Sequence, residues 1–589
     1  MTVLGTAQTF KRDWLDGFVT AYGRTVRKVP DAYGVIGRQV PRQGKVAVVI
    51  GGGCGHYPAF AGLVGPGLAD GAVIGDVFTS PSAEQVYRTA KAADGGAGVL
   101  FGYGNYAGDV LHFGLAARRL AAEGIDSRTI LVTDDIASGS AEDAENRRGV
   151  AGDFLVFKIA GAAAQRGDDL AGVHAAAVKA NASTRTFGAA FGGCTLPGAA
   201  EPLFRVGEQE MELGLGIHGE PGVRTVGRLD AAELADELVD GLLPELPLSG
   251  SDGRVVVLLN GLGRTKYEEM FVTYTRVHER LAAAGLNPLH TEVGEFVTSL
   301  DMAGVSLSVM VLDDELAELY SAPCDTPGYR STGAVLETVE LESTVDATLT
   351  GAEGAAGEGL ADQVLTAALA AVTEAEDELG RLDAVAADGD HGLGITRGMR
   401  AAVAAARAAE QDGEPLSGAL LRAGTALADA SGGASGALYG VLLAETGAGL
   451  RGLDSAEITA TAVADAVDNA AKAFVELGKA EPGDKTMLDA IEPFRRVLRE
   501  QAISGAAVAD AWCEAAQRAA GAARETADLV PAKGRAARLA ERSKGHADPG
   551  ATSFALIVTA VGAALTSRTQ ASRTPASRTP AFRTQAGES

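Results

Sequence analysis

Hydrophobic residues in the first 330 positions come in short runs rich in valine, leucine and isoleucine, separated by longer stretches of helical character. Such runs predict β-strands, and strands that alternate with helices predict an α/β region. Three of the runs lead into loops that are rich in glycine or carry aspartate, and functional loops in open α/β sheets follow the carboxyl ends of strands. The predicted strands are 45–50, 99–101, 129–134, 254–260 and 306–312.

The pattern changes after about Glu337. From 360 to 565 the chain is rich in alanine, repeats its apolar positions with helical spacing and is nearly free of β-branched runs. We therefore predict an all-α second domain of seven or eight helices. Its clearest helical stretches are 361–379, 397–410, 456–477 and 506–526.

These changes divide the chain into four segments. An α/β domain occupies 1–337, a linker rich in glycine and acidic residues occupies 338–357, and the helical domain occupies 358–566. The last segment, 567–589, repeats variants of Ser-Arg-Thr-Pro-Ala. We predict that this tail is disordered, because such a composition cannot build a hydrophobic core.

Composition limits the possible partners and compartment. The chain has 589 residues, more than a single core usually holds, and its formal charge of −26 argues against nucleic acid as the main partner. Its four cysteines form no CxxC pair, which is typical of a reducing compartment. The most apolar stretch, 555–565, is too short to cross a bilayer, and 10–14 interrupts any signal segment. We expect a cytoplasmic protein without a membrane partner.

Three aspartates lie within eight residues of the helical domain, at Asp383, Asp388 and Asp390. They do not share one helix face, so we expect a loop that turns at Gly389. Their carboxylates would repel one another unless a hard cation neutralised them, and Mg²⁺ held together with substrate phosphates fits this chemistry. A solvated acidic turn is the alternative, but the following 392–394 and a helix N-terminus favour a phosphate site.

Three further loops of the helical domain are rich in glycine or carry aspartate: 431–436, 478–486 and 546–552. The second is close to a P-loop pattern, but no strand precedes it and Asp484 is inserted, so we exclude a P-loop. Each loop alone could be a packing device. Together with the aspartate loop, they predict a nucleotide site at one end of the helical bundle.

Two histidines and one aspartate stand out in the α/β domain. The run 51–56 follows a strand, but it does not form a dinucleotide-binding fingerprint because position 56 is histidine. Its glycines suit a small polar ligand that the main chain approaches closely. Asp109 lies near the end of another strand, where it could act as a general base, and His218 lies in a second glycine-rich loop. Any single histidine is by default structural, but the three residues predict a shared site.

The sequence resembles the dihydroxyacetone kinase family, in its single-chain ATP-dependent form. The resemblance covers about 10–566 and rests on GGGCGHYPAFAGLVG, GDVFTSPS and GIHGEPG in the first domain and on DGDHG and GHADPGATS in the second. It implies an α/β domain that binds a ketose and an antiparallel eight-helix barrel that binds ATP. It also implies a homodimer formed through the first domain.

The resemblance assigns roles to individual residues. His218 matches the histidine that binds the ketose carbonyl as a covalent hemiaminal, and Asp109 matches the residue that accepts the proton of the attacking hydroxyl. Asp383, Asp388 and Asp390 match the residues that hold two Mg²⁺ ions on the ATP phosphates. The matching ketose-contacting loop is Gly53, Cys54, Gly55 and His56. The matching nucleotide-lining residues are His391, Gly392, Leu393, Gly394, Ala434, Ser435, Gly478, Met487, Arg535, Asp548, Pro549 and Gly550.

One position departs from the family pattern. Typical dihydroxyacetone kinases carry lysine where this chain has Gly104, which removes a cation and opens space. Together with 260–267 and 294–303, this resembles the erythrulose kinase branch, whose four-carbon ketose needs room for one more CHOH group. The alternatives are a dihydroxyacetone kinase, a non-catalytic ketose-binding regulator, and a variant that takes phosphate from a phosphocarrier protein.

Overall fold

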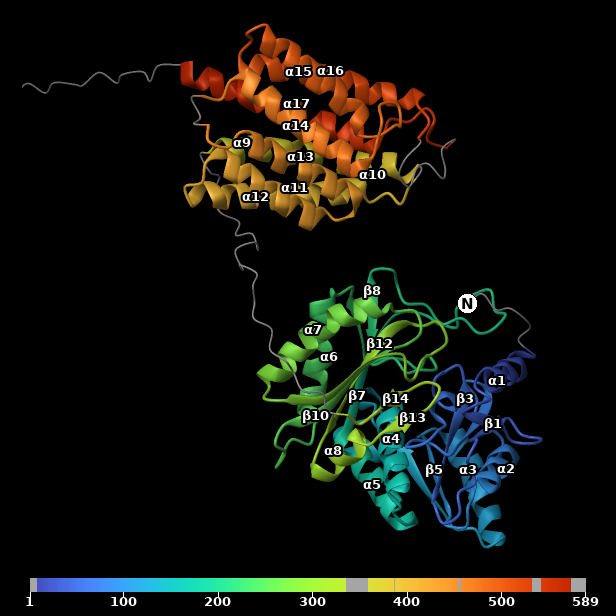
Figure 1. Cartoon of the computed structure of the whole chain (residues 1–589). Coiled ribbons are helices and arrows are strands. Elements are labelled where there is room, and N and C mark those ends of the chain that lie inside the picture. Colours follow the sequence, from blue (N-terminus) through green and yellow to red (C-terminus); the bar gives the residue numbers. More distant parts are fainter. Residues whose placement is uncertain (1–7, 335–358, 386, 454–456, 532–541, 574–589) are drawn as a thin grey trace, which may run out of the picture. The chain divides into compact units, whose positions relative to one another are not determined.

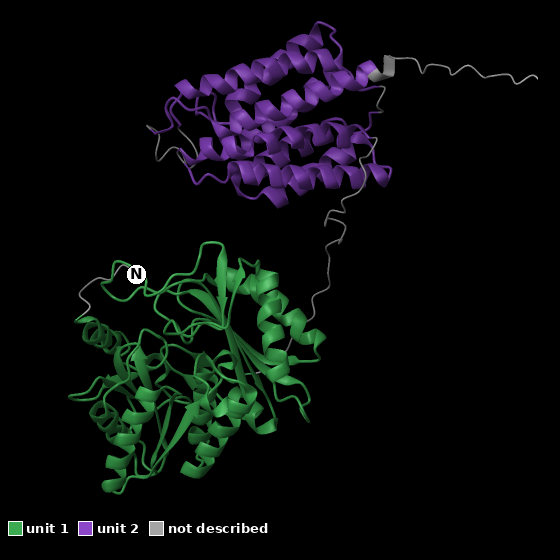
Figure 2. Cartoon of the chain, turned by 180° about the vertical axis from the view of Figure 1, so that it is seen from behind, with its two compact units in different colours: residues 1–338 green, residues 339–589 purple. Residues whose placement is uncertain are grey.

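The structure is a computed structural model of the chain, and it describes residues 8–334, 359–385, 387–453, 457–531 and 542–573. The chain forms two compact units, Met1–Thr338 and Val339–Ser589 (Figure 2). The predicted linker, 338–357, lies outside the described residues. Unit 1 is an α/β fold and unit 2 is all-helical, which confirms the predicted fold class.

The first sheet of unit 1 is mostly parallel. Its strand order is β1-β2-β4-β3-β5-β6, in which β4, β3, β5 and β6 run parallel to one another. Three of the five strands predicted from the sequence lie in this sheet at nearly the expected bounds, and the other two lie in the second sheet. The strands are β1 (Val26–Lys28), β2 (Gly34–Gly37), β3 (Ala47–Cys54), β4 (Gly71–Val77), β5 (Val99–Gly104) and β6 (Ser127–Val132).

The second sheet of unit 1 is mostly antiparallel, with the order β11-β10-β12-β7-β8-β9. Only the β10–β11 pair is parallel among the described strands of this sheet. Its strands are β7 (Thr184–Gly192), β8 (Glu210–Leu213), β9 (Arg224–Gly227), β10 (Arg254–Gly261), β11 (Asn287–Gly294) and β12 (Ala303–Val311), and a short pair, β13 (Cys324–Asp325) and β14 (Arg330–Ser331), follows.

Helices separate and cover the two sheets (Figure 1). Helices α4 and α5 contact strands of both sheets, and every side chain of α4 from Gly152 to Ala164 is buried. Helices α2 and α3 cover the other face of the first sheet, and α6 and α7 cover the other face of the second. The helices of unit 1 are α1 (Phe10–Ala21), α2 (Ala83–Ala93), α3 (Ala107–Ala122), α4 (Gly152–Arg166), α5 (Leu170–Ser183), α6 (Ala231–Leu242), α7 (Tyr267–Ala283) and α8 (Asp314–Ser321).

The parallel strands bring several loops to one edge of the first sheet. Strands β3 and β5 pair in register, with Ile50 opposite Gly102, so the loops after Cys54 and Gly104 leave the same edge. The loop after β4 reaches the same edge, because β4 pairs in parallel with β3. This edge therefore gathers the glycine-rich loop, the start of α3 and the segment around Phe78.

Unit 2 contains nine α-helices within its described residues, one more than the upper expectation. The predicted helix 361–379 is broken at Ala375, where α9 ends and α10 begins. Acidic Glu376, Asp377 and Glu378 then occupy the first turn of α10, which their charge stabilises. The helices are α9 (Leu360–Glu374), α10 (Glu376–Ala384), α11 (His391–Gln411), α12 (Leu416–Ser431), α13 (Gly433–Gly449), α14 (Ala460–Gly478), α15 (Leu488–Ile503), α16 (Val508–Glu525) and α17 (Pro549–Arg573).

Helix α17 corrects two sequence-based expectations. It continues to Arg573, seven residues into the predicted tail, and the rest of the tail lies outside the described residues. Among the described helices it is also the one long and apolar enough to cross a membrane, over 549–570 with a mean hydropathy of 1.5. Uncharged glycine, serine and threonine residues extend its apolar character beyond 555–565. Because Phe554 and Val558 are buried in the core of unit 2, α17 is a core helix.

Candidate active site

Two histidines from distant loops form the centre of the site in unit 1. His56 follows β3 and is only 2% exposed, and its Nδ1 lies 2.7 Å from the Thr298 carbonyl oxygen. Its Nε2 lies 3.0 Å from Nε2 of His218, which comes from the loop between β8 and β9. The ring of Phe78 stacks on His56, and the ring of Tyr106 meets His218 edge-on. The structure thus brings together the two histidines that the sequence singled out.

The hydrogen bonds fix the protonation of this pair. Nδ1 of His56 must donate to Thr298, since a carbonyl oxygen only accepts. Burial, together with the charge of the nearby His218, lowers the pKa of His56 to about 3, so His56 is neutral and its Nε2 accepts. Nε2 of His218 therefore donates to His56, while Nδ1 of His218 lies 3.1 Å from a Glu220 carboxylate oxygen and donates as well. The two rings together hold one proton more than two neutral imidazoles.

Glu220 balances this proton and is itself held in place. Burial alone would raise the pKa of Glu220, but the hydrogen bond and charge of His218 lower it to about 2. The carboxylate also accepts a hydrogen bond from the backbone N–H of His218. Nη1 of Arg148 lies 3.9 Å from a carboxylate oxygen of Glu220. The Nε and Nη2 atoms of the same arginine both donate to Oδ2 of Asp135. This chain of charges fixes the orientation of the His218 ring.

Asp109 lies in the first turn of α3 and is buried. Ser80 donates to its Oδ2 at 2.7 Å, whereas its Oδ1 is buried without a hydrogen-bond partner among the described residues. Burial raises the pKa of Asp109, and the bond from Ser80 and the charge of His218 act in the opposite direction. A carboxylate with a raised pKa and an unused oxygen is suited to accept a proton.

The glycines of the ketose loop serve close backbone packing. A Cβ on Gly53 would lie 2.7 Å from the backbone nitrogen of Thr79, and Gly55 has a φ of +108°. Neither position accepts a side chain without a shift of the main chain. Cys54 is buried at the end of β3, and burial raises the pKa of its thiol to about 12, so it is not a nucleophile.

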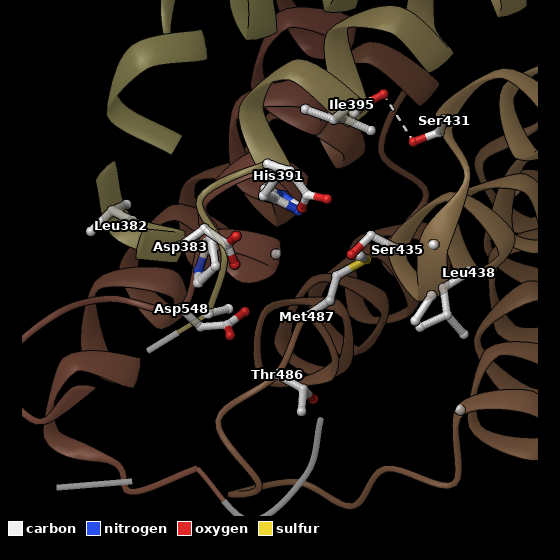
Figure 3. Close-up of a pocket in the computed structure, with 18 of the residues that line it drawn as sticks. Leu382, Asp383, His391, Ile395, Ser431, Ser435, Leu438, Thr486, Met487 and Asp548 are labelled. Carbon is white, nitrogen blue, oxygen red and sulfur yellow. Dashed lines mark hydrogen bonds between the residues drawn. The ribbon is translucent and has the colours of Figure 1, made fainter. Parts of the chain in front are cut away.

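The site in unit 2 is a cavity of about 720 Å³ at one end of the helices. Figure 3 shows Asp383, His391 and Asp548 around the same space as Ser435 and Met487. Gly392 does not line this cavity, contrary to the prediction: a Cβ there would lie 2.0 Å from the Glu376 carbonyl oxygen, so Gly392 packs against α10. Arg535 lies outside the described residues. The predicted nucleotide-binding residues that line the cavity are His391, Leu393, Gly394, Ala434, Ser435, Gly478, Met487, Asp548, Pro549 and Gly550.

The three aspartates converge at the wall of this cavity. One carboxylate oxygen from each of Asp383, Asp388 and Asp390 lies within 4.8 Å of the others. The loop between them turns at Gly389, which has a φ of +82° and donates its N–H to Asp383 at 2.9 Å. The three potential metal ligands are all carboxylate oxygens, and two of the three aspartates are exposed. The group therefore suits a hard divalent cation that also contacts a phosphate.

Two buried ionisable residues, Lys485 and Asp548, line the cavity. Lys485 is only 4% exposed and donates to the carbonyl oxygens of Leu529 and Ser543. Asp548 caps the start of α17 by accepting from the N–H of Ala551 at 2.7 Å, and burial raises its pKa to about 7. Ser553 links His391 to Tyr439 by hydrogen bonds of 2.8 and 2.7 Å.

Several residues of the site in unit 1 were not predicted from the sequence. Glu220, Ser80 and Tyr106 contact the predicted residues, and Thr298 comes from a segment 242 residues away from His56. Glu220 and Ser80 stand inside the motifs GIHGEPG and GDVFTSPS, so a reading of each motif residue by residue could have found them. Thr298 contributes only its backbone carbonyl, and no side-chain signal marks it.

Two families match the chain, one in each unit. The Dak1 domain matches residues 16–328 and the DAK2 domain matches residues 385–563. The Dak1 match contains the residues of the unit 1 site, and the DAK2 match contains those of the unit 2 site except Leu382 and Asp383, which lie just before it.

Similar proteins extend over almost the whole chain. A D-erythrulose kinase from Mycolicibacterium smegmatis is 50% identical over 575 residues, which are 95% of this chain and 98% of that protein. An L-erythrulose 1-kinase from the same organism is 49% identical over 573 residues, with 96% and 99% covered. The crystal structure of the dihydroxyacetone kinase of C. freundii in complex with AMP-PNP and Mg²⁺ is 29% identical, with a TM-score of 0.57 and 96% and 99% of the two chains covered.

Proposed function

The chain belongs to the dihydroxyacetone kinase family and is a ketose kinase, and we propose that it transfers a phosphoryl group from ATP to a terminal hydroxyl of erythrulose. The observation that carries this proposal is an identity of 50% and 49% to two erythrulose kinases over almost the whole length of the chain. Gly104 supports it, because it stands where typical dihydroxyacetone kinases carry lysine, a departure that resembles the erythrulose kinase branch. The two relatives are a D-erythrulose kinase and an L-erythrulose 1-kinase, so the proposal covers both enantiomers.

The ketose is captured by the histidine pair. Nε2 of His218 adds to the carbonyl carbon as its proton passes to Nε2 of His56, and His56 then donates that proton to the former carbonyl oxygen. One N–C bond forms, the C=O double bond becomes a C–OH group, and the positive charge stays on the substituted His218 ring. Glu220 stabilises that charge, since it already accepts the Nδ1–H bond. An alcohol cannot form this adduct, so glycerol is excluded.

The captured ketose then presents a terminal hydroxyl to Asp109. The unused Oδ1 of Asp109 accepts the hydroxyl proton as the oxygen attacks the γ-phosphorus of ATP. The bond between that phosphorus and the β,γ-bridging oxygen breaks, and ADP leaves. Reversal of the capture step then breaks the N–C bond to His218, restores the carbonyl group and releases the ketose phosphate. Ser80 holds the other oxygen of Asp109 and so orients the carboxylate.

Unit 2 holds the phosphate donor. Asp383, Asp388 and Asp390 would hold two Mg²⁺ ions, which would neutralise the ATP phosphates. The first residues of α11 and α17 line the same cavity, and helix N-termini favour phosphate. The ten lining residues named above would surround the nucleotide. We also propose a homodimer in the cytoplasm, in line with the family resemblance.

The substrate screen tests this function. The purified chain is assayed with ATP and Mg²⁺, without phosphocarrier proteins, on D-erythrulose, L-erythrulose and dihydroxyacetone. We expect at least one erythrulose enantiomer to have the highest kcat/KM and ADP to form in equal amounts with ketose phosphate. A preference for dihydroxyacetone would make this a triose kinase. Turnover only with a phosphocarrier protein, or ketose binding without turnover, would support the other two alternatives.

A further inference from the structure

Unit 1 contains a cavity, separate from the ketose site, that three arginines line. It has a volume of about 230 Å³, and its charged lining residues are Arg24, Arg38, Arg42, Asp70 and Asp325. Asp70 directly precedes β4, which runs parallel to β3. Because the ketose loop follows the end of β3, the cavity lies at the opposite edge of the first sheet. The mechanism above uses none of its residues.

The three arginines have no acidic partner among the described residues. Arg42 donates a hydrogen bond to the side-chain amide oxygen of Gln165 at 2.6 Å, and the side chains of Arg24 and Arg38 form no hydrogen bond within the described protein. A guanidinium group is charged at every physiological pH. Three such charges around one small cavity repel one another, and an anion bound between them would offset the repulsion.

The two aspartates of the cavity do not balance these arginines, because each is paired with a cation that does not line the cavity. Oδ2 of Asp70 accepts hydrogen bonds from Nζ of Lys45 and, at 2.9 Å, from the backbone N–H of Val48. Oδ1 of Asp325 lies 2.8 Å from Nε of Arg330. The cavity therefore keeps a net positive charge in a chain whose formal charge is −26. Oδ1 of Asp70 has no hydrogen bond among the described residues and can accept one from a ligand.

These groups define a ligand with an anionic end and a hydroxyl-bearing end. Guanidinium groups match the oxygens of a phosphate group, and a phosphate monoester carries a charge of about −1.5 to −2 at pH 7, which suits several arginines better than a single carboxylate does. Carboxylates only accept hydrogen bonds, so the other end of the ligand must donate them. A hydroxyl group suits this role better than an ammonium group, because both aspartates already have a cation. The volume of about 230 Å³, against about 720 Å³ in unit 2, favours a molecule smaller than a nucleotide.

We propose that this cavity binds a small phosphorylated polyol. Arg24, Arg38 and Arg42 hold the phosphate group, and Asp70 accepts a hydrogen bond from a hydroxyl group. The product of the proposed reaction, a ketose phosphate, belongs to the same chemical class. The cavity shares no residue with the two proposed sites, so its test does not depend on the kinase activity.

Calorimetric titration of the full chain at low ionic strength tests the phosphate and hydroxyl contacts. The probes are glycerol 3-phosphate and methyl phosphate, two phosphate monoesters of which only the first carries hydroxyl groups. We expect glycerol 3-phosphate to bind severalfold more tightly, because its hydroxyl groups donate to the cavity carboxylates. Added salt should weaken both, since the arginines are near the surface. Equal affinities for the two probes, or no binding of either, would overturn the proposal.

Arginine variants locate the binding. Arg24→Ala and Arg38→Ala should each weaken the binding of glycerol 3-phosphate about tenfold or more, because each removes charge-assisted hydrogen bonds to the phosphate. Their Tm should equal that of the unchanged protein, since neither side chain has a hydrogen-bond partner in the described protein. The exposed Arg118→Ala in α3 is the matched control and should leave the affinity unchanged. The same affinity in the unchanged protein and in both cavity variants would show that glycerol 3-phosphate binds elsewhere and would contradict the assignment.

Discussion

The proposed ketose site of unit 1 and the proposed nucleotide site of unit 2 differ in how deeply their polar groups are buried. In unit 1, His56 and Asp109 are buried, and their pKa values are shifted mainly by burial. In unit 2, Asp388 and Asp390 are exposed at the wall of a cavity of about 720 Å³. A covalent step on a small ligand depends on groups whose proton affinities are tuned by burial. A large anion with metal ions needs room and accessible oxygens instead.

Replacing the nucleophile should give the largest effect. We expect His218→Ala to lower kcat/KM for the ketose by about 10³-fold or more, because the covalent capture step is lost. Affinity for ATP, measured by calorimetry, should stay unchanged, since His218 lies in the other unit. The exposed His278→Ala is the control and should behave like the unchanged protein. Full turnover in His218→Ala would rule out the covalent mechanism.

Replacing one of the three metal-binding aspartates should impair the site in unit 2 and leave the site in unit 1 unchanged. We expect Asp390→Asn to lower kcat by about 10²-fold, because one oxygen donor with negative charge is lost from the site. Ketose binding in the absence of ATP should be unaffected. The exposed Asp510→Asn in α16 is the matched control for a lost surface charge. Weaker ketose binding in Asp390→Asn would contradict the assignment of the ketose and the phosphate donor to separate sites.

Glu220→Gln should have a smaller effect, of about tenfold on kcat/KM for the ketose, because a neutral amide no longer balances the extra proton on the histidine pair. The exposed Glu208→Gln serves as control.

The same variant predicts a change in stability with pH. The pKa of Glu220 falls from 4.5 to about 2 on folding, so its charged form stabilises the protein above pH 4.5, and this contribution disappears as pH falls from 4.5 towards 2. Thermal unfolding should show a Tm difference between the unchanged protein and Glu220→Gln at neutral pH that shrinks over this range. A constant difference from pH 6 to pH 3 would contradict this assignment.

A pair of glycine substitutions should give the smallest effects and compare the rigidity of the two sites. A Cβ on Gly53 meets backbone atoms at 2.7 Å, whereas a Cβ on Gly478 meets the flexible end of Leu438 at 3.3 Å. We expect Gly53→Ala to cost about 1–3 kcal/mol of stability and to raise KM for the ketose. Gly478→Ala should change KM for ATP by no more than about twofold, since the Leu438 side chain can move. Equal tolerance at both positions would contradict the contrast in packing.

Much of the fold followed from the sequence, because the apolar patterns of strands and helices are local. The strands that end at Cys54 and Gly104 and the Ala-rich helices of unit 2 appear close to their expected bounds. The break at Ala375 and the extension of α17 to Arg573 depend on capping and packing, which a helical period alone does not mark.

The residues of the site were predictable where a motif contains them and unpredictable where tertiary contact creates them. Asp383, Asp388 and Asp390 are neighbours in sequence, and they converge as expected. Gly392 stands in the same motif but serves helix packing, which its residue type does not reveal.

The covalent capture of the ketose is tested most directly by carbon-13 NMR of erythrulose labelled at C2 and mixed with the full chain without ATP. The account predicts that a stoichiometric part of the C2 signal moves from the carbonyl region to the region of tetrahedral carbons. It also predicts that this new signal is absent with His218→Ala. A bound ketose whose C2 signal stays in the carbonyl region would contradict the account.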